Sequence, residues 1–300
     1  MEPHLVDLPS TQREPIAALR FLRSPLSFEF LHSLGLHPRF SWYAVQIKHS
    51  RLCDTGVGDV DLLCGQLEWT DPALHQKLVA DNAKRDPHAP PYLWDELAAI
   101  ELVNSGGIKW PPALDYLVGV EAKCAYLDPE ADSDRAVKSG KSSRSKVRHT
   151  RNQLQALLEL GLNRVVLLDL IANPPSGGID GLAWLNASDA AQRSKGALSN
   201  ALVARLAESS PCGHWVMSMG SVVGGNENFR GAGLPEKLRD AVENPLLREE
   251  ATRAQRNELE TRLHRVLEKL PYPQWFPPTY VDCTRCKTIH SLDPELEFCD

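Results

Sequence analysis

The feature that most constrains the fold is a pair of apolar segments separated by one amphipathic helix. Residues 116–126 (YLVGVEAKCAY) and 165–171 (VVLLDLI) have the aliphatic and β-branched content of buried strands. Between them, residues 147–161 (VRHTRNQLQALLELG) have helical spacing and end at a glycine. Residues 42–52 and 59–67 add two earlier strand candidates. The order strand, strand, strand, helix, strand predicts an α/β fold.

The remaining sequence predicts how the chain is divided. We expect helices near 26–35, 92–104, 188–208 and 235–269, and a strand at 214–223. A proline-glycine break lies at 173–178, and a proline-aromatic tether follows at 271–278. We therefore predict a core at 1–178 with an inserted segment at 68–115, an extension at 179–270 packed on the core, and a cysteine-bearing tail at 271–300.

Composition excludes several classes of protein. No run of about 18 apolar residues is present, and the N-terminus lacks the apolar core of a secretory signal, so we expect a cytoplasmic protein without membrane contact. Seven cysteines without a disulfide rhythm are expected to be mostly reduced. The net charge of -6 argues against a surface that is basic overall, as nucleic-acid-binding proteins often have. Whether the chain binds nucleic acid must therefore be judged from the local distribution of charge.

Charged residues inside an apolar strand mark the first candidate site. Side chains alternate faces along a strand, so Glu121 and Lys123 share one face while the neighbouring valines and Cys124 share the other. Apolar flanks place both charges near a core, where an unpaired charge is costly. By itself this pattern is also compatible with an ordinary cross-strand salt bridge on a solvated sheet.

A second strand carries acids in the same way. In residues 58–64 (GDVDLLC) the alternation puts Asp59 and Asp61 on one face. If the two strands are neighbours, carboxylates and a lysine converge, and a hard divalent cation such as Mg²⁺ or Mn²⁺ relieves the repulsion between the carboxylates. Asp61, Glu121 and the Ala122 carbonyl would hold this metal, and Lys123 would position or activate a water and offset developing charge. This chemistry is phosphodiester hydrolysis.

These residues resemble the PD-(D/E)XK nucleases, the family with the restriction-endonuclease-like fold. The resemblance rests on GDVDLL at 58–63, EAK at 121–123 and RNQLQAL at 151–157. It implies a mixed sheet flanked by helices, with an inserted segment and a C-terminal extension. It also implies that Asp61 and Glu121 bind metal, that Lys123 acts with the attacking water, and that Gln153 supports the site.

The resemblance leaves some assignments open. Gln155 is the other candidate for the supporting glutamine, and Glu29 is the match for a glutamate that the family's first helix often contributes. The separation of Asp61 from Glu121 exceeds the family's usual hairpin, so Asp59 or Asp115 could take the role of the aspartate.

A basic run follows the proposed catalytic strand. Residues 135–151 (RAVKSGKSSRSKVRHTR) contain no acid. Lysine, arginine and serine contact phosphate oxygens and carry affinity rather than base identity. The nucleic-acid contacts that we expect are Lys138, Lys141, Arg144, Lys146, Arg148 and Arg151; the alternative is a solvated loop.

The C-terminal tail contains a second candidate metal site. Cys283 and Cys286 form a C-x2-C pair, His290 follows four residues later, and Cys299 is the third cysteine. Three thiolates and an imidazole would complete a tetrahedral zinc site. The alternative is a tail without metal.

The function that these features predict is a magnesium-dependent endonuclease acting on DNA, with RNA also open because nothing reads a 2′-hydroxyl. By analogy with the family alone, we expect a role in bacterial phage defence or restriction, as a homodimer or with a partner protein of such a system. One rival is a sugar-nucleotide transferase in which Asp59 and Asp61 hold a metal and a nucleotide diphosphate. The other is a non-catalytic nucleic-acid- or protein-binding module on a nuclease-like fold.

Overall fold

A computed structural model describes most of the chain. The described residues are 10–23, 27–37, 40–54, 59–85, 88, 91–127, 137–138, 143–172, 211–221, 227–228, 235–270, 277–283 and 286–291. The expected helix at 188–208, together with Arg135, Lys141 and Cys299, lies outside these residues.

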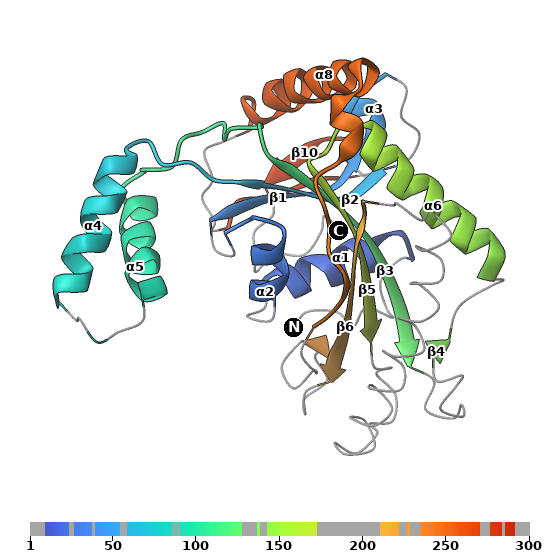
Figure 1. Cartoon of the computed structure of the whole chain (residues 1–300), viewed down its shortest axis with the longest axis horizontal. Helices are drawn as coiled ribbons and strands as arrows, with labels where there is room; N and C mark the ends of the chain where they lie inside the picture. The colour runs from blue at the N-terminus through green and yellow to red at the C-terminus, as the bar shows by residue number, and fades with distance from the viewer. Residues whose placement is uncertain are drawn as a thin grey trace.

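The described part of the chain alternates helices and strands (Figure 1). The helical elements are α1 (Ser10–Arg23), α2 (Ser27–Ser33), α3 (His49–Leu52), α4 (Pro72–Arg85), α5 (Pro91–Asn104), α6 (Ser143–Glu159), the 3-10 helix η3 (Pro245–Arg248) and α8 (Glu250–Leu267). The strands are β1 (Ser41–Lys48), β2 (Asp59–Gln66), β3 (Leu117–Leu127), β4 (Val137–Lys138), β5 (Arg164–Ala172), β6 (Gly213–Ser221), β7 (Glu227–Asn228), β8 (Glu236–Arg239), β9 (Thr279–Asp282) and β10 (Ile289–Ser291).

The strands form one mixed sheet in the order β10-β9-β1-β2-β3-β5-β6-β7, with β4 paired to β3 and β8 paired to β6. β1, β2 and β3 are antiparallel neighbours, whereas β3, β5 and β6 run parallel. The parallel pair β3 and β5 is connected through α6, as a crossover requires. The expected α/β class and its order of strand, strand, strand, helix, strand are confirmed.

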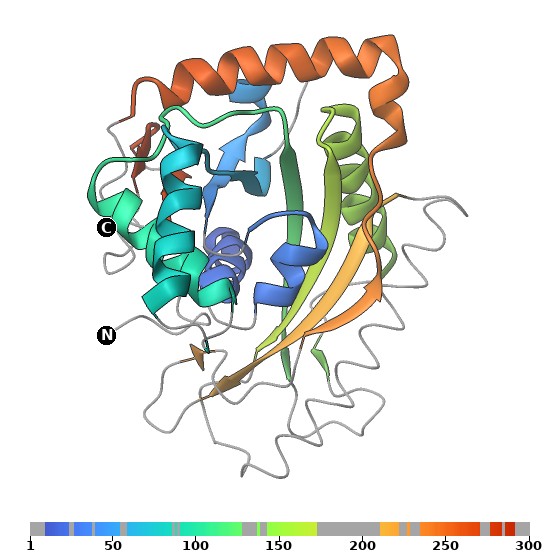
Figure 2. The ribbon, with the colours of Figure 1, turned by 60° about the vertical axis from the view of Figure 1, so that its left-hand side comes forward.

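Two apolar layers cover the two faces of this sheet. On one face, α1 and α2 pack against alternate residues of β3, such as Val118 and Val120. On the other face, α6 and α8 pack over Leu117, Leu167 and their neighbours. Figure 2 shows α8 running along one end of the sheet. The polar residues of β2 and β3 therefore lie between two closed layers, which gives them a low-dielectric surrounding.

Residues between β2 and β3 form a helical hairpin, α4 and α5, that projects from the sheet (Figure 1). A bridge between Trp69 and Ile108 closes its base. Asp95 of α5 contacts His75 at 3.1 Å and His37 at 2.8 Å, so it ties the two helices to the loop after α2. The inserted segment expected at 68–115 is thus observed as a compact insertion, and α4 is a helix that the sequence analysis missed.

One expectation about the C-terminal half is wrong. The helix expected over 235–269 starts only at Glu250, because residues 236–239 form β8 against β6 and Pro245 opens a 3-10 turn. The division expected at residues 178 and 270 is not visible in the sheet, since β6, β8, β9 and β10 all join it. The described strands after residue 210 therefore belong to the same sheet as β1, β2, β3 and β5. Among the described residues, no helix combines the length and the hydropathy needed to cross a membrane.

Candidate active site

The site forms where β2 and β3 separate. Their antiparallel pairing runs from Gly65 opposite Leu117 to Leu62 opposite Val120 and ends there. One residue further, Asp61 Oδ2 accepts a hydrogen bond from the backbone N–H of Ala122 at 2.8 Å. The Asp61 side chain, which is 10 % exposed, thus binds a backbone donor of β3. This contact fixes its carboxylate against the strand that carries Glu121 and Lys123.

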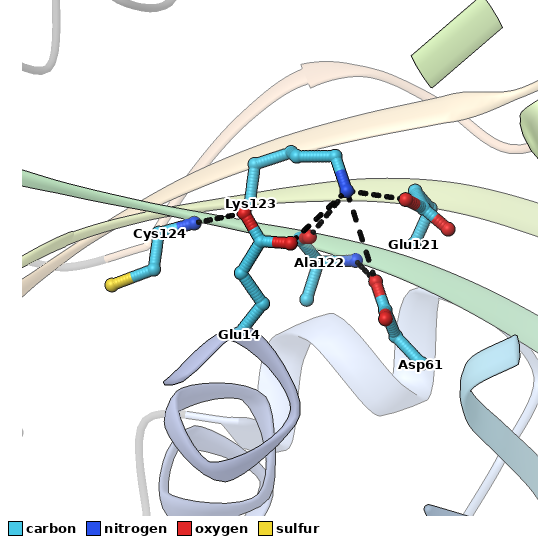
Figure 3. A network of polar contacts seen from close by, with 6 residues as sticks. All are labelled: Glu14, Asp61, Glu121, Ala122, Lys123 and Cys124. Atoms are coloured by element: carbon cyan, nitrogen blue, oxygen red, sulfur yellow. Dashed lines mark hydrogen bonds and ion pairs between the residues drawn. The ribbon is translucent and has the colours of Figure 1, made fainter. Parts of the chain in front are cut away.

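The Lys123 ammonium is the centre of the site (Figure 3). It donates a short hydrogen bond to Glu121 Oε1 and one of 3.0 Å to the Ala122 carbonyl oxygen. Asp61 Oδ2 lies 4.0 Å from the same Nζ atom. Three oxygens from two strands therefore surround one positive charge, and they belong to the residues that the sequence predicted as metal ligands.

Burial changes the proton affinities of all three side chains. Burial raises the pKa of Glu121 to about 7 against the opposing pull of Lys123, and Glu121 is fully buried. Burial, with Glu121 next in size, raises the pKa of Asp61 well above its ordinary value. Burial works to lower the pKa of Lys123, but the carboxylates of Glu121, Asp61 and Glu14 outweigh it and raise that pKa. A cluster of buried carboxylates with displaced pKa values is typical of functional sites.

One carboxylate of the site was missed by the sequence analysis. Glu14 of α1 places Oε2 3.3 Å from Lys123 Nζ and accepts from the Cys124 backbone N–H at 3.5 Å with Oε1. Glu29, the glutamate assigned to this position by resemblance, is exposed on α2. The available signal was the amphipathic pattern of residues 10–23, whose apolar side packs on the sheet and brings Glu14 to β3.

The two candidate glutamines differ in their surroundings. Gln155 is exposed and donates to Glu159 at 2.9 Å, so it does not serve the site. Gln153 is half-buried, and its Oε1 has no hydrogen-bond partner among the described residues. A Cβ on Gly119 would lie 3.5 Å from Leu157, so α6 packs closely over the face of β3 that carries Glu121. Gln153, one helical turn before Leu157, lies on that side of α6.

The alternative aspartates are less suited than Asp61. Asp59 is half-buried at the start of β2, where it pairs in register with Lys48 of β1, and its charge helps to raise the pKa of Glu121 without a direct contact to Lys123 among the described ion pairs. Asp115 is exposed before β3 begins and lines a hollow of about 430 Å³ between residues 109–115 and α8. That hollow contains none of the residues around Lys123. Asp61 is the aspartate that the structure brings to Glu121.

A second buried ionisable pair lies on the adjacent strands. Asp169 is aligned with Lys123 in the β3–β5 register, and its Oδ2 lies 2.8 Å from His214 Nε2 of β6. Both side chains are buried, and His214 Nδ1 has no hydrogen-bond partner within the described ranges. Neither residue was singled out from the sequence, because each is the lone polar residue of an apolar strand segment and carried no motif.

The basic run lies directly after β3. Lys138 is in β4, which pairs with the end of β3, and Arg144, Lys146, Arg148 and Arg151 belong to the first half of α6. Helix α6 thus begins earlier than the sequence indicated and includes much of this run. Arg151 is exposed.

The candidate zinc ligands lie away from this site, at the β10 edge of the sheet. Cys283, Cys286 and His290 come together around the β9–β10 turn, one ligand atom each.

Comparison with known proteins finds no family model, no curated protein and no solved structure that matches this chain. The fold and the site define an α/β protein with a buried cluster of carboxylates and a lysine between two strands of the sheet. Any assignment of activity must rest on the geometry of this cluster.

Proposed function

We propose that this protein is a metal-dependent nuclease with a restriction-endonuclease-like fold that hydrolyses DNA phosphodiester bonds. The observation that carries the proposal is the convergence of Asp61 Oδ2, Glu121 Oε1 and the Ala122 carbonyl oxygen around one cation, the Lys123 ammonium. Hard divalent cations prefer such oxygen ligands. The position of the ammonium shows that the negative charge of these oxygens is directed to one point between them.

The residues fit a divalent cation by a second criterion. Glu121 Oε2 is buried and has no hydrogen-bond partner among the described residues. A buried, unsatisfied carboxylate oxygen costs free energy that a metal or an ordered water offsets. Magnesium or manganese bound by Asp61, Glu121 and the Ala122 carbonyl would polarise the scissile phosphate and lower the pKa of a bound water.

The chain's own side chains have separate tasks in this proposal. Lys123 keeps its proton, because three carboxylates raise its pKa, and its ammonium offsets negative charge that develops on the phosphate. Glu14 Oε2 forms a second ion pair with Lys123 Nζ at 3.3 Å. This contact would keep the ammonium at the site when Glu121 and Asp61 bind a metal. Gln153 supports the face of β3 that carries Glu121.

The basic residues supply the contact to the nucleic acid. Lys138, Arg144, Lys146, Arg148 and Arg151 follow β3 in β4 and α6, so their backbone continues from the end of the strand that carries Lys123. Such residues hold phosphates without reading sequence. Residues 135–151 contain seven basic residues and no acid, although the chain as a whole is acidic.

The second candidate is a nucleic-acid-binding module without activity. One observation favours it: the Lys123 ammonium already neutralises the carboxylates, so the cluster is satisfied in part without a metal. A transferase centred on Asp59 and Asp61 has less support, since Asp61 accepts a hydrogen bond from β3 and the transferase assigns no task to Glu121 or Lys123.

Cleavage assays separate these functions. Purified full-length protein is incubated with supercoiled plasmid, linear duplex and single-stranded RNA, with magnesium or with none, beside Lys123→Ala. Lys109→Ala is the matched control, because Lys109 is an exposed lysine paired with Glu68. We expect magnesium-dependent DNA cleavage by the wild type and the control, and a rate at least about 10²-fold lower for Lys123→Ala. Wild-type protein that binds DNA but cuts none of the substrates would support the binding module instead.

A further inference from the structure

The hairpin at the β9 edge of the sheet gathers three soft ligands at one point. Cys283 directly follows β9, Cys286 lies in the turn, and His290 lies in β10. Their two sulfurs and one ring nitrogen all lie within 4.8 Å of one another. Ligands around one tetrahedral zinc ion, bound at about 2.3 Å for sulfur and 2.0 Å for nitrogen, are about 3.5–4 Å apart. The cluster therefore needs only small adjustments to bind one ion.

The backbone of the turn is folded around the first sulfur. The Cys286 N–H points to Cys283 Sγ at 3.5 Å, a contact that favours a thiolate there. Both backbone polar groups of Cys283 are hydrogen-bonded within the turn. The Cys283 carbonyl oxygen accepts from the Lys287 N–H at 2.9 Å, and the Cys283 N–H donates to the Thr288 carbonyl oxygen at 3.0 Å. Lys287 has a left-handed φ of 57°, which a residue with a side chain rarely adopts without compensation. This turn directs both sulfurs to the same side.

The histidine is oriented as a metal ligand is. His290 Nδ1 lies 3.4 Å from the Ser291 carbonyl oxygen, and the tautomer with its proton on Nδ1 can donate to this carbonyl. Metal-binding histidines usually donate one ring N–H to such a carbonyl and ligate through the other nitrogen. Nε2 is then the ligand atom.

We propose that Cys283, Cys286 and His290 bind a structural zinc ion. A redox function of the C-x2-C pair fits less well, because a histidine shares the cluster of the two sulfurs. Soft thiolates with an imidazole select zinc over the hard cations of the carboxylate site. Zinc binding releases the thiol protons to solvent and involves no oxidation or reduction.

The ion would secure the edge of the sheet. Asp282, the residue before Cys283, is fully buried and binds Arg51 Nε at 2.7 Å and the Lys48 backbone N–H at 3.2 Å. β9 pairs with β1, and β1 pairs with β2, which carries Asp61. Zinc would therefore hold β9 and β10 against β1 without contacting the carboxylate cluster. This site and the nuclease activity can thus be confirmed or rejected independently.

Metal analysis of the purified full-length chain tests the proposal. We expect one zinc per chain, and at least about a tenfold lower zinc content in Cys286→Ser, whose exposed position leaves the fold intact. Cys124→Ser is the matched control, because it removes a partly exposed thiol outside the cluster and should keep the zinc. His290→Cys, which supplies another soft ligand, should also retain it.

Cobalt substitution identifies the ligands. Co²⁺ bound in place of zinc should give sulfur-to-cobalt charge-transfer absorption in the wild type and in Cys124→Ser, and this absorption should be lost in Cys286→Ser. A wild-type chain with far less than one zinc, or a Cys286→Ser chain with unchanged zinc and cobalt spectrum, would overturn the proposal.

Discussion

Asp61 Oδ2 accepts a hydrogen bond from the Ala122 backbone N–H at 2.8 Å, at the first position where the β2–β3 register no longer continues. A side chain thus takes the place of a ladder partner, and the strands can separate there without leaving a buried N–H unpaired. At this point the Glu121 carboxylate and the Ala122 carbonyl oxygen contact the same cation, the Lys123 ammonium. Asp61 therefore has a structural and a proposed catalytic task, and the two can be separated by mutation.

Replacing Asp61 by asparagine and by alanine should separate these tasks. Asp61→Asn keeps an oxygen for the Ala122 N–H but loses the charge, so we expect near wild-type stability and no cleavage. Asp61→Ala leaves that buried N–H without this acceptor and should lower the free energy of unfolding by about 1–3 kcal/mol. Urea denaturation measures the difference. Equal stability of the two variants would contradict the role of the hydrogen bond.

Glu14 should matter for activity and Glu29 should not. Glu14→Gln weakens the second anchor of the Lys123 ammonium, which is held at 3.3 Å, and we expect a cleavage rate about tenfold lower. Glu29→Gln changes an exposed residue of α2 and serves as the matched control. Single-turnover rates of duplex cleavage measure both. A loss of rate in Glu29→Gln with none in Glu14→Gln would show that the carboxylates are assigned the wrong way round.

Stability in the absence of added divalent cations should fall as the pH rises. The pKa of Glu121 is raised from 4.5 to about 7 in the folded chain, so the folded state holds this proton more tightly than the unfolded state. The resulting stabilisation is fully present below pH 4.5 and is lost as the pH rises to about 7. Its size is about 3 kcal/mol.

Urea unfolding of the wild type and Glu121→Gln between these two pH values checks this dependence. The variant should show a distinctly smaller decline, while the exposed-site control Glu101→Gln should follow the wild type. Parallel curves for all three proteins would mean that Glu121 ionises in the folded chain as it does in water.

The buried pair of Asp169 and His214 should support the sheet. His214→Ala removes the 2.8 Å contact to the Asp169 carboxylate and leaves a cavity in a fully buried position, so we expect a loss of about 3 kcal/mol in stability. Thermal unfolding is a direct measurement. His32→Ala, in the last turn of the short α2 at the surface, is the control and should have little effect.

Strand alternation and local motifs were enough to place much of the site. The apolar segments around Glu121 and Asp61 could be identified because each strand is buried on both faces and reads as a continuous apolar run. The pairing of β2 with β3 follows from their adjacency once α4 and α5 are recognised as an insertion. The three residues Asp61, Glu121 and Lys123 were therefore predicted together, and the structure brings them together.

The missed features depend on contacts between distant parts of the chain. Glu14 is one acid in a helix whose docking on β3 no local pattern specifies. The residues of β8 carry exposed polar side chains and form a strand only because the edge of β6 is available to pair with them. Strand β9 likewise depends on a distant partner, because it follows a proline-rich tether and pairs with β1, far back in the sequence.

The rate of duplex DNA cleavage over a series of magnesium concentrations, for the wild type beside Glu121→Gln, tests the central claim most directly. The substitution keeps the volume and a hydrogen-bond acceptor at the centre of the cluster but removes the charge that would bind the metal. We predict a wild-type rate that rises with magnesium and saturates, and a variant rate lower by at least about 10³-fold at every concentration. Cleavage by Glu121→Gln at the wild-type rate, with the same magnesium dependence, would contradict the proposed centre.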